Sequence, residues 1–274
     1  MKYTNAQTQL FETILLHENN IYEKQKVCKV FTFIWIADGE LQITIDNIPR
    51  VIPQKSMLCI SPNQNVIINK CEYGQYLLQY NREFYCIIQH DKEVSCAGLL
   101  FFGPYQNVVL SVNDLLSDRL NTLVQILEEE FKNNDSLQGE MLRILLKRLI
   151  ITCTRLAKKQ LFLEDYNTSE LDLFRHFSIL VEQHFIKEHS VQFYAEQLHK
   201  APKTLSNQFA ILKLQTPIEI IHQRIILEAK RLITYTQLSF SEIAFELGYE
   251  ELAHFSRFFK NHTSISPSEY RKKL

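Results

Sequence analysis

The chain has 274 residues, 46% of them hydrophobic, and 30 Lys+Arg against 31 Asp+Glu give it a formal net charge of −1. This length allows two domains, and the balanced charge excludes a protein that is basic throughout. No stretch approaches the roughly 18 uninterrupted apolar residues of a membrane span. Glu12, His17 and Glu18 stand where a signal peptide would be apolar. We therefore expect a cytoplasmic protein with no membrane partner.

The first half of the chain, residues 1–112, carries the signals of short β-strands. The segment 26–36, KVCKVFTFIWI, is rich in β-branched and aromatic residues and runs into Asp38-Gly39, a hairpin signal. The sequence LQITID from residue 41 alternates apolar and polar residues, which is the period of a half-buried strand. Further short strands are predicted at 56–60, 66–68, 76–80 and 83–88. Strands at this spacing predict a small barrel or sandwich.

Two amphipathic helices are predicted after Val112, between about residues 113 and 160. The first is capped by Asn113 or Asp114, the second ends near the basic pair Lys158-Lys159, and the sequence NNDSLQG separates them. Such a helical hairpin can pack on the sheet or form a dimer contact, and the two roles are compatible. Residues 161–170 are predicted to be a linker.

The second half contains a duplicated pattern of apolar and small residues. Its first copy is Ala195, Leu198, Leu205, Phe209, Pro217 and Ile220, and its second is Ala244, Leu247, Phe255, Phe259, Pro267 and Tyr270. The copies are offset by 49 residues before the turn and by 50 after it. Duplication of one structural unit is the better explanation of so many matched steps.

Each copy has the pattern of a helix-turn-helix. In the first, Ser190 is expected to cap a short helix, and Pro202 begins the second helix. In the second copy, Ser241 is expected to cap the sequence SEIAFELG, and Gly248 is expected to end it with a positive φ. A long helix from Pro217 to about residue 234 would connect the two units. Since the second helix of such a unit enters the major groove, the pattern predicts two reading helices on one chain.

Three segments resemble the C-terminal signature of AraC/XylS-type transcription regulators: RIILEAKRLI, SEIAFELGY and HFSRFFKNHTSISPSEYR. The resemblance covers about residues 170–274, and the first half is similar to the cupin-like regulatory domain that such proteins often carry. It implies an α+β protein with a cupin-like β-barrel and helical hairpin in residues 1–160, the linker 161–170, and a double helix-turn-helix domain in 171–274. It also implies a regulator that reads promoter DNA, with RNA polymerase as a further partner and a homodimer formed through residues 113–160.

The resemblance assigns candidate DNA-binding residues to both reading helices. The first set is Lys203, Thr204, Ser206 and Asn207. The second set is Ala253, His254, Arg257 and Lys260, the last toward phosphate. Arg257 is the strongest candidate, because a guanidinium can bond a guanine edge in bidentate fashion. Its alternatives are a backbone contact or an ion pair with Glu250 or Glu251, and the alternative for His254 is a partly buried surface histidine.

The chain departs from the family pattern at two turns. Ser264 stands where the family usually has glycine, and serine tolerates a positive φ poorly. The first copy has Leu214 at the equivalent position, and Ala210-Ile211 where two basic residues are expected, so the first reading helix carries less phosphate-contacting charge. Residues 169–274 hold 13 Lys+Arg and 12 Asp+Glu. The positive charge is therefore local, and it is expected in Arg257, Lys260, Arg271, Lys272 and Lys273.

A cupin-type enzyme or small-molecule-binding protein, with the helical domain as an interaction module, is the competing class. Cupin enzymes usually bind a metal through two or three histidines, but residues 1–168 contain only His17 and His90. A cluster of Cys86, His90, Asp91 and Cys96 could hold a metal or sense redox state, but it matches no zinc spacing, so a structural role is favoured. Nucleotide-binding and hydrolase motifs are missing.

We therefore expect no catalytic residue, metal or cofactor. The six cysteines, none in a CxxC pair, are expected to be small buried hydrophobes. Five residues are expected either to fill the barrel or to line a pocket for a small effector: Phe31, Phe33, Trp35, Ile43 and Ile45.

Overall fold

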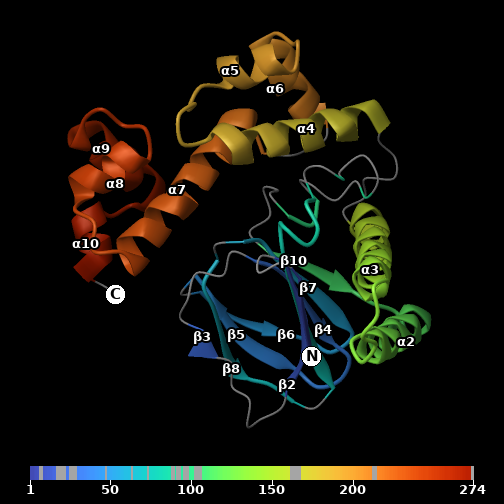
Figure 1. The fold of residues 1–274 in the computed structure, drawn as a ribbon. Helices are drawn as coiled ribbons and strands as arrows, with labels where there is room; N and C mark the ends of the chain where they lie inside the picture. The colour runs from blue at the N-terminus through green and yellow to red at the C-terminus, as the bar shows by residue number, and fades with distance from the viewer. Residues whose placement is uncertain are drawn as a thin grey trace. The chain divides into compact units, whose positions relative to one another are not determined.

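The computed structural model divides the chain into two compact units, residues 1–165 and 166–274 (Figure 1). It describes residues 1–5, 9–16, 23–24, 30–46, 48–62, 64–72, 74–87, 90, 94, 99–101, 107–160, 168–211 and 215–272. Each unit has its own hydrophobic core and is described by itself.

The first unit is built from two antiparallel sheets and a helical hairpin. The strands are β1 (Lys2–Asn5), β2 (Gln9–Leu16), β3 (Glu23–Lys24), β4 (Val30–Ile36), β5 (Leu41–Ile45), β6 (Ile48–Ile52), β7 (Ser56–Ile60), β8 (Val66–Lys70), β9 (Gln75–Asn81) and β10 (Val108–Ser111). A larger sheet has the order β1-β2-β9-β4-β7-β10, and a smaller one has the order β3-β8-β5-β6. The α+β class is confirmed.

The two sheets face each other across an aliphatic core, as a sandwich does. Ile34 and Ile36 of β4 belong to the same buried cluster as Ile43 and Ile45 of β5. Within the described residues the sheets are not joined edge to edge, so the expected closed barrel is corrected to two packed sheets. Pro49 lies in β6, an edge strand, which is where a residue without an N–H can be accommodated.

The five residues expected to line one pocket lie on two faces of the larger sheet. Successive side chains of a strand point to opposite faces. Ile43 and Ile45 pack with the even-numbered residues of β4 in the core between the sheets. Phe31, Phe33 and Trp35 point to the other face, where Phe33 meets Phe101 with ring centroids 5.3 Å apart. A pocket made of all five is therefore wrong, and both faces are filled by buried side chains.

The strand expected at 83–88 is also corrected. The chain turns after β9, because Asn81 accepts hydrogen bonds from the N–H of Phe84 on both its backbone and its side-chain oxygen, at 3.2 and 3.1 Å. The N–H of Tyr85 donates to the same backbone oxygen at 3.2 Å. Local capping by an asparagine side chain thus overrides the β-propensity of the apolar residues that follow.

The helical hairpin consists of α2 (Asp114–Glu130) and α3 (Gln138–Gln160), as the sequence predicts. Asn113 caps α2 by accepting a hydrogen bond from the N–H of Leu116 at 3.0 Å. The hairpin lies beside the larger sheet, next to β4, β7 and β10 (Figure 1). The indole N–H of Trp35 donates to Asn121 Oδ1 of α2 at 2.8 Å, and this bond joins the outer face of β4 to the hairpin.

The second unit is entirely helical in its described residues. Its helices are α4 (Thr168–His184), α5 (Val191–Gln197), α6 (Pro202–Ile211), α7 (Pro217–Tyr235), α8 (Phe240–Glu246), α9 (Leu252–Thr263) and α10 (Pro267–Lys272). Helix α4 begins at Thr168, before the end of the segment 161–170 that was expected to be a linker. No helix among the described residues is long and apolar enough to cross a membrane.

Candidate nucleic-acid interface

The first helix-turn-helix is formed by α5 and α6 and is supported by α4. Phe209 of α6 is fully buried, and its ring centroid lies 4.9 Å from that of Phe177 of α4. Phe177 also meets Tyr194 of α5 at 5.5 Å. Ala195 is fully buried, in agreement with the expectation that a small residue is needed where the two helices cross.

The second helix-turn-helix, α8 and α9, packs on the connecting helix α7. Phe255 and Phe259 of α9 are fully buried with Ile243 and Ala244 of α8, and residues of α7 complete the cluster. Apolar positions of both copies therefore face inward as the repeat predicts. What remains outward on α6 and α9 is mostly polar.

The turns of the two helix-turn-helix motifs make equivalent hydrogen bonds. In the first motif His199 has φ 53°, and the N–H of Lys200 donates to the carbonyl of Ala195 at 2.9 Å. In the second, Gly248 has φ 77°, and the N–H of Tyr249 donates to the carbonyl of Ala244, also at 2.9 Å. Each pair of equivalent residues is 49 positions apart. The structure thus supports duplication of one unit.

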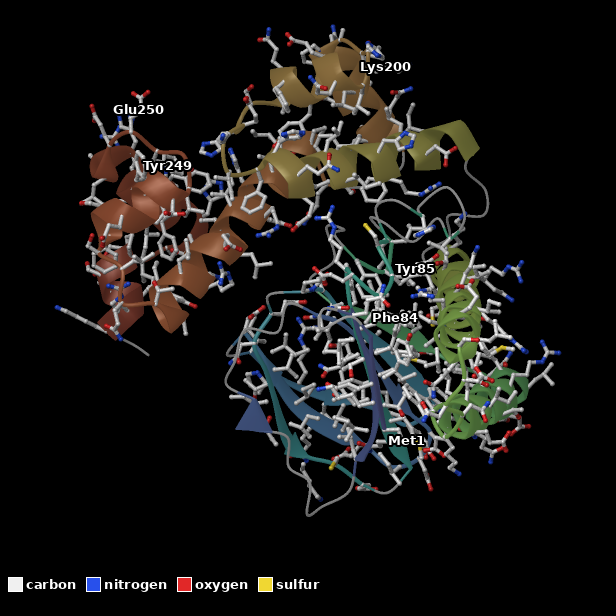
Figure 2. The ribbon with its side chains drawn as sticks, viewed as in Figure 1. Met1, Phe84, Tyr85, Lys200, Tyr249 and Glu250 are labelled. Carbon is white, nitrogen blue, oxygen red and sulfur yellow. The ribbon has the colours of Figure 1, made fainter. Side chains whose placement is uncertain are left out.

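The second turn requires glycine for two reasons, its positive φ and the lack of space for a Cβ, whereas the first turn accommodates His199. A Cβ at Gly248 would lie 2.1 Å from the carbonyl oxygen of Ile186, in the segment after α4. His189 of that segment meets Tyr249 with ring centroids 4.8 Å apart. Figure 2 shows Lys200 in the first turn and Tyr249 with Glu250 in the second.

Reciprocal Ser/Thr–Glu capping boxes begin three of the helices. Thr216 with Glu219 caps α7, and Ser239 with Glu242 caps α8. The Glu242 carboxylate accepts from the hydroxyl and the N–H of Ser239, both at 2.7 Å, and these bonds lower its pKa.

The third box, Ser266 with Glu269 at α10, lies 50 residues after the first, which extends the duplication. The S/T-x-x-E spacing of all three boxes is visible in the sequence. The expected cap at Ser241 is wrong, because α8 already begins at Phe240. Ser190 does stand at the N-cap of α5, but its side chain makes no capping hydrogen bond.

Four candidate residues lie on α6. Lys203, Thr204 and Asn207 are exposed, whereas Ser206 is half-buried. The hydroxyl of Ser206 donates to the carbonyl of Pro202 at 3.0 Å, inside its own helix. Ala210 and Ile211 follow at the exposed end of α6, and Leu214 is outside the described residues.

The other four candidate residues, Ala253, His254, Arg257 and Lys260, are all exposed on α9. Ala253, Arg257 and Lys260 follow at helical spacing along one face. Glu251, one of the alternative partners of Arg257, lies near His254 instead, with 3.7 Å between Oε2 and Nε2. Within the described part of the chain, no ion pair is formed by Arg257. The His254 side chain is 66% exposed, so it is not partly buried.

Two of the C-terminal residues considered at the sequence level have structural roles. Arg271 donates to the carbonyls of Ile233 and Leu238 at 3.3 and 2.9 Å, and its guanidinium lies 4.5 Å from the Phe240 ring centroid. Arg271 therefore fixes α10 to the two ends of the α7–α8 connection. Because its guanidinium is used in these contacts, Arg271 is no longer expected to contact phosphate. Ser264 adopts φ 66°, the left-handed conformation that glycine adopts most readily, and its N–H donates to the carbonyl oxygen of Lys260 at 2.8 Å.

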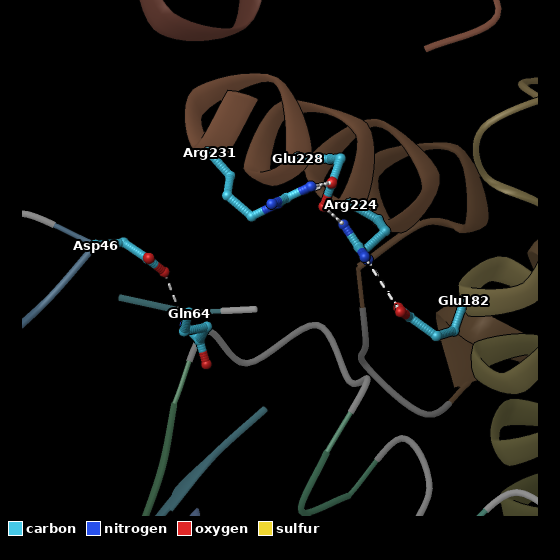
Figure 3. Close-up of polar contacts among 6 residues, drawn as sticks. All are labelled: Asp46, Gln64, Glu182, Arg224, Glu228 and Arg231. Carbon is cyan, nitrogen blue, oxygen red and sulfur yellow. Dashed lines mark hydrogen bonds and ion pairs between the residues drawn. The ribbon is translucent and has the colours of Figure 1, made fainter. Parts of the chain in front are cut away.

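A charged cluster that sequence reasoning missed fixes α7 against α4. Arg224 of α7 donates to both carboxylate oxygens of Glu182 of α4, at 2.7 and 3.1 Å, and to Glu228 at 3.2 Å (Figure 3). Arg231 completes the cluster by donating to Glu228 at 2.8 Å. The Arg224 guanidinium also lies 3.9 Å from the ring centroid of Phe185. Because Glu182 and Arg224 are 42 residues apart, no local pattern could have paired them.

A histidine pair joins α7 to the end of α9. His222 Nδ1 and His262 Nε2 are 3.1 Å apart, and His262 Nδ1 lies 2.9 Å from the carbonyl oxygen of Phe258. Burial, followed by the neighbouring His262 and His189, lowers the pKa of His222. The neutral form of the His222 imidazole is therefore favoured.

The cysteine–histidine cluster of the first unit is only partly described. Cys86 is buried, and His90 stacks on Tyr85 with ring centroids 4.9 Å apart, while Asp91 and Cys96 lie outside the described residues. Among the residues that the structure describes, no group of three or more metal-ligating side chains is assembled.

Comparison with known proteins gives a family match in the second unit. Residues 194–273 match the family model "Helix-turn-helix domain". The "Uncharacterized HTH-type transcriptional regulator YdiP" of Escherichia coli K12 is 43% identical over 59 residues, which are 22% of this chain and 20% of that protein. The "HTH-type transcriptional activator RhaS" of Escherichia coli is 26% identical over 161 residues, 59% of this chain and 56% of RhaS. The chain thus spans a fifth to about half of these relatives.

Among solved structures, ToxT from Vibrio cholerae has a TM-score of 0.44 and 17% identity over 96% of this chain and 98% of that one.

Proposed function

Residues 194–273 match a helix-turn-helix family model, and we propose that the protein is a sequence-specific DNA-binding transcription regulator of the AraC/XylS type. The observation that carries the proposal is the duplicated unit. Two helices, α6 and α9, occupy equivalent places in units with the same turn geometry, and both present polar, exposed residues. A single reading helix would need no such second copy.

In the proposed complex, α6 and α9 enter successive major-groove segments on one face of the duplex. Such segments are separated by one helical turn, about 34 Å. Helix α7 is well suited to hold this spacing. The Arg224–Glu182 contacts fix it to α4, which supports the first helix-turn-helix, and its residues Ile226 and Ala229 pack into the core of the second helix-turn-helix. Two helix-turn-helix motifs joined by a flexible connection would gain less affinity from binding the same duplex together.

Arg257 is assigned to base recognition and Lys260 to phosphate. Arg257 is exposed at the outward face of α9 without a partner in the described chain, so its planar guanidinium is available for the bidentate bond to guanine. On α6, Lys203, Thr204 and Asn207 are the exposed candidates, and Ser206 contributes only if its hydroxyl leaves the Pro202 carbonyl. The weaker charge of α6 makes α9 the dominant reading helix.

The first unit is proposed to bring two copies together through α2 and α3, and to place RNA polymerase contacts beside the promoter. This role needs no ligand, although a small effector remains a prediction of the sequence. A protein that reads promoters works where the chromosome is, so a cytoplasmic location follows from the same proposal.

The test is selection from a random pool of DNA duplexes by the full chain, repeated over a salt series. We expect a motif that spans two major-groove segments, and a log–log salt slope of about −0.9 for each neutralised phosphate. Absence of salt-dependent binding would overturn the proposal.

Two variants separate base reading from charge at Arg257. Arg257→Ala should weaken binding by about 1–3 kcal/mol and relax the preference at one base pair. Arg257→Lys keeps the positive charge and removes the planar fork, so it should retain most of the salt slope and still lose the base preference. If Arg257→Ala weakened DNA binding equally on all sequences and Arg257→Lys restored it fully, Arg257 would be a phosphate contact instead.

A further inference from the structure

Two histidines from different helices of the second unit bring their ring nitrogens together. His222 Nδ1 on α7 and His262 Nε2 near the end of α9 are 3.1 Å apart, although the residues are 40 positions apart in the chain. The two ring centroids are 4.8 Å apart, and the ring planes are nearly perpendicular, at 81°. Since no local spacing links residues so distant, the sequence alone could not indicate a metal site here.

A hydrogen bond inside α9 determines which nitrogen of His262 carries the proton. His262 Nδ1 lies 2.9 Å from the carbonyl oxygen of Phe258. A carbonyl oxygen can only accept, so Nδ1 is the donor, and Nε2 of His262 keeps its lone pair on the side of His222. Metal-binding histidines are usually held in this way, with the second ring nitrogen donating to a backbone carbonyl or a carboxylate.

The surroundings of the histidine pair hold both rings in place and leave them within reach of water. The ring centroid of Phe258 lies 4.4 Å from that of His262 and 5.1 Å from that of His222. His222 is half-buried, whereas His262 is exposed. Water can therefore reach the pair and supply the remaining ligands of a bound ion. The neutral form favoured for His222 is also the form that binds metal.

The separation of the two nitrogens fits coordination to one ion. Nitrogens that bind an ion at about 2.05 Å are about 2.9 Å apart at a right angle and about 3.3 Å apart at the tetrahedral angle. The observed 3.1 Å lies between these values. We propose that His222 and His262 form a two-histidine site for a divalent late transition-metal ion, a class of ion that suits imidazole ligands. The ion takes the place of the His222 Nδ1 proton, which moves to Nε2 of the same ring, so both facing nitrogens offer lone pairs.

An ion in this site would join the connecting helix α7 to the reading helix α9. Phe258 and His262, four residues apart on α9, both contact His222 of α7. Arg257 and Lys260 are exposed along a different line of the helix. The ion would therefore bind away from the proposed DNA contacts and fix the orientation of α9. This consequence rests on the proposed function, whereas the metal site itself does not depend on it.

Calorimetric titration of the full chain with Ni²⁺ tests the site. The chain has six cysteines, and Ni²⁺ is chosen because thiolates also bind Zn²⁺ strongly, whereas imidazole suits Ni²⁺. His222→Gln and His262→Gln should each weaken Ni²⁺ binding about tenfold or more, since even the outer-shell partners of a metal ligand contribute that much.

The matched control is His176→Gln, at an exposed histidine of α4, which should bind Ni²⁺ as the wild type does. Circular dichroism checks that each variant is folded. Equal affinity of all four proteins for Ni²⁺, or an equal loss in the control, overturns the proposal.

A further variant locates the ion without relying on a loss of binding. His262→Cys supplies a thiolate in place of the imidazole, and thiolate-bound Co²⁺ has a charge-transfer absorption band in the near ultraviolet that imidazole-bound Co²⁺ lacks. After subtraction of the wild-type spectrum with Co²⁺, His262→Cys should show this band and His176→Cys should not. Spectra of both variants equal to that of the wild type overturn the proposal.

The effect of the ion on DNA binding is measured with the duplex that the full chain selects. Saturating Ni²⁺ should tighten binding of this duplex by the wild type about threefold or more and leave His222→Gln unchanged, because a fixed α9 loses less conformational freedom on binding. Unchanged DNA affinity of the Ni²⁺-bound wild type refutes the role in DNA binding and leaves the metal site intact. If the chain binds Ni²⁺ through this pair but selects no duplex, the proposed function fails and the metal site stands.

Discussion

Replacing Arg224 by methionine tests whether the buried charges between α4 and α7 hold the first helix-turn-helix in place. The Arg224 side chain is only 15% exposed, and its partners Glu182 and Glu228 are 20% and 11% exposed. Methionine fills similar volume but leaves the Glu182 carboxylate without its two N–H donors. Removing one partner of a buried pair costs about 3–5 kcal/mol, and we expect about 3 because Glu182 retains some solvent contact.

Two comparisons determine whether that loss comes from the stranded carboxylate. Arg224→Met/Glu182→Leu removes both charges and should recover most of the stability, since apolar groups can replace a buried pair at little cost. Arg231→Met leaves Glu228 bonded to Arg224 and should cost about 1 kcal/mol, the usual net value of one hydrogen bond.

The assay is urea unfolding of the full chain, followed by two signals. Trp35 is the one tryptophan of the sequence and lies in the first unit, so its fluorescence follows that unit. Circular dichroism also follows the helices of the second unit. The variant should shift the circular dichroism transition and leave the Trp35 transition unchanged. A loss below about 1 kcal/mol, or no recovery in the double variant, would refute the reasoning.

Three further predictions concern single residues of the second unit, each measured by the same unfolding assay. Ser264→Gly should raise stability by about 0.5–1 kcal/mol, because glycine adopts a positive φ without steric cost; a loss would mean that the serine is not strained. Gly248→Ala should lower stability by about 2–4 kcal/mol, since it adds a Cβ against Ile186 O at a positive φ. The folded pKa of His222 is lowered, so stability should be constant above pH 7 and fall as pH drops below about 6.5. His222→Gln should flatten that fall, and an unchanged pH profile would exclude His222 as its source.

Much of the second unit could be predicted because its signals are local. The apolar spacing of both copies placed Leu205, Phe209, Phe255 and Phe259 in the core, and the offset of 49 residues matches the equivalence of the two turns. Two serines, Ser239 and Ser241, stand near the start of α8, and only Ser239 has a glutamate three residues later. The S-x-x-E spacing therefore identifies Ser239 as the cap, and the reciprocal hydrogen bonds with Glu242 agree with it.

The first unit was predicted less well, since its arrangement depends on strand pairing between distant segments. Alternation along β5 correctly marked its buried positions, but the composition of β4 could not say which of its two buried faces meets β5. In the structure the face with Ile34 and Ile36 meets β5, so Phe31, Phe33 and Trp35 lie on the opposite face from Ile43 and Ile45. The five residues therefore do not line one common pocket. The turn at Asn81 shows the opposite limit, because local hydrogen bonds to the backbone and side-chain oxygens of Asn81 outweigh the strand propensity of the residues that follow.

The sequence by itself determined the two-part organisation, the helical repeat and the exposed residues of α6 and α9, since these follow from periodicity and capping within a few turns of chain. Only the tertiary structure decided which charged residues are available. Arg271 is used by two backbone carbonyls and Arg224 by a glutamate on another helix, while Arg257 stays exposed. The physical reason is that a guanidinium finds its partners by proximity in space, and proximity across 30 or 40 residues is set by packing and not by local pattern.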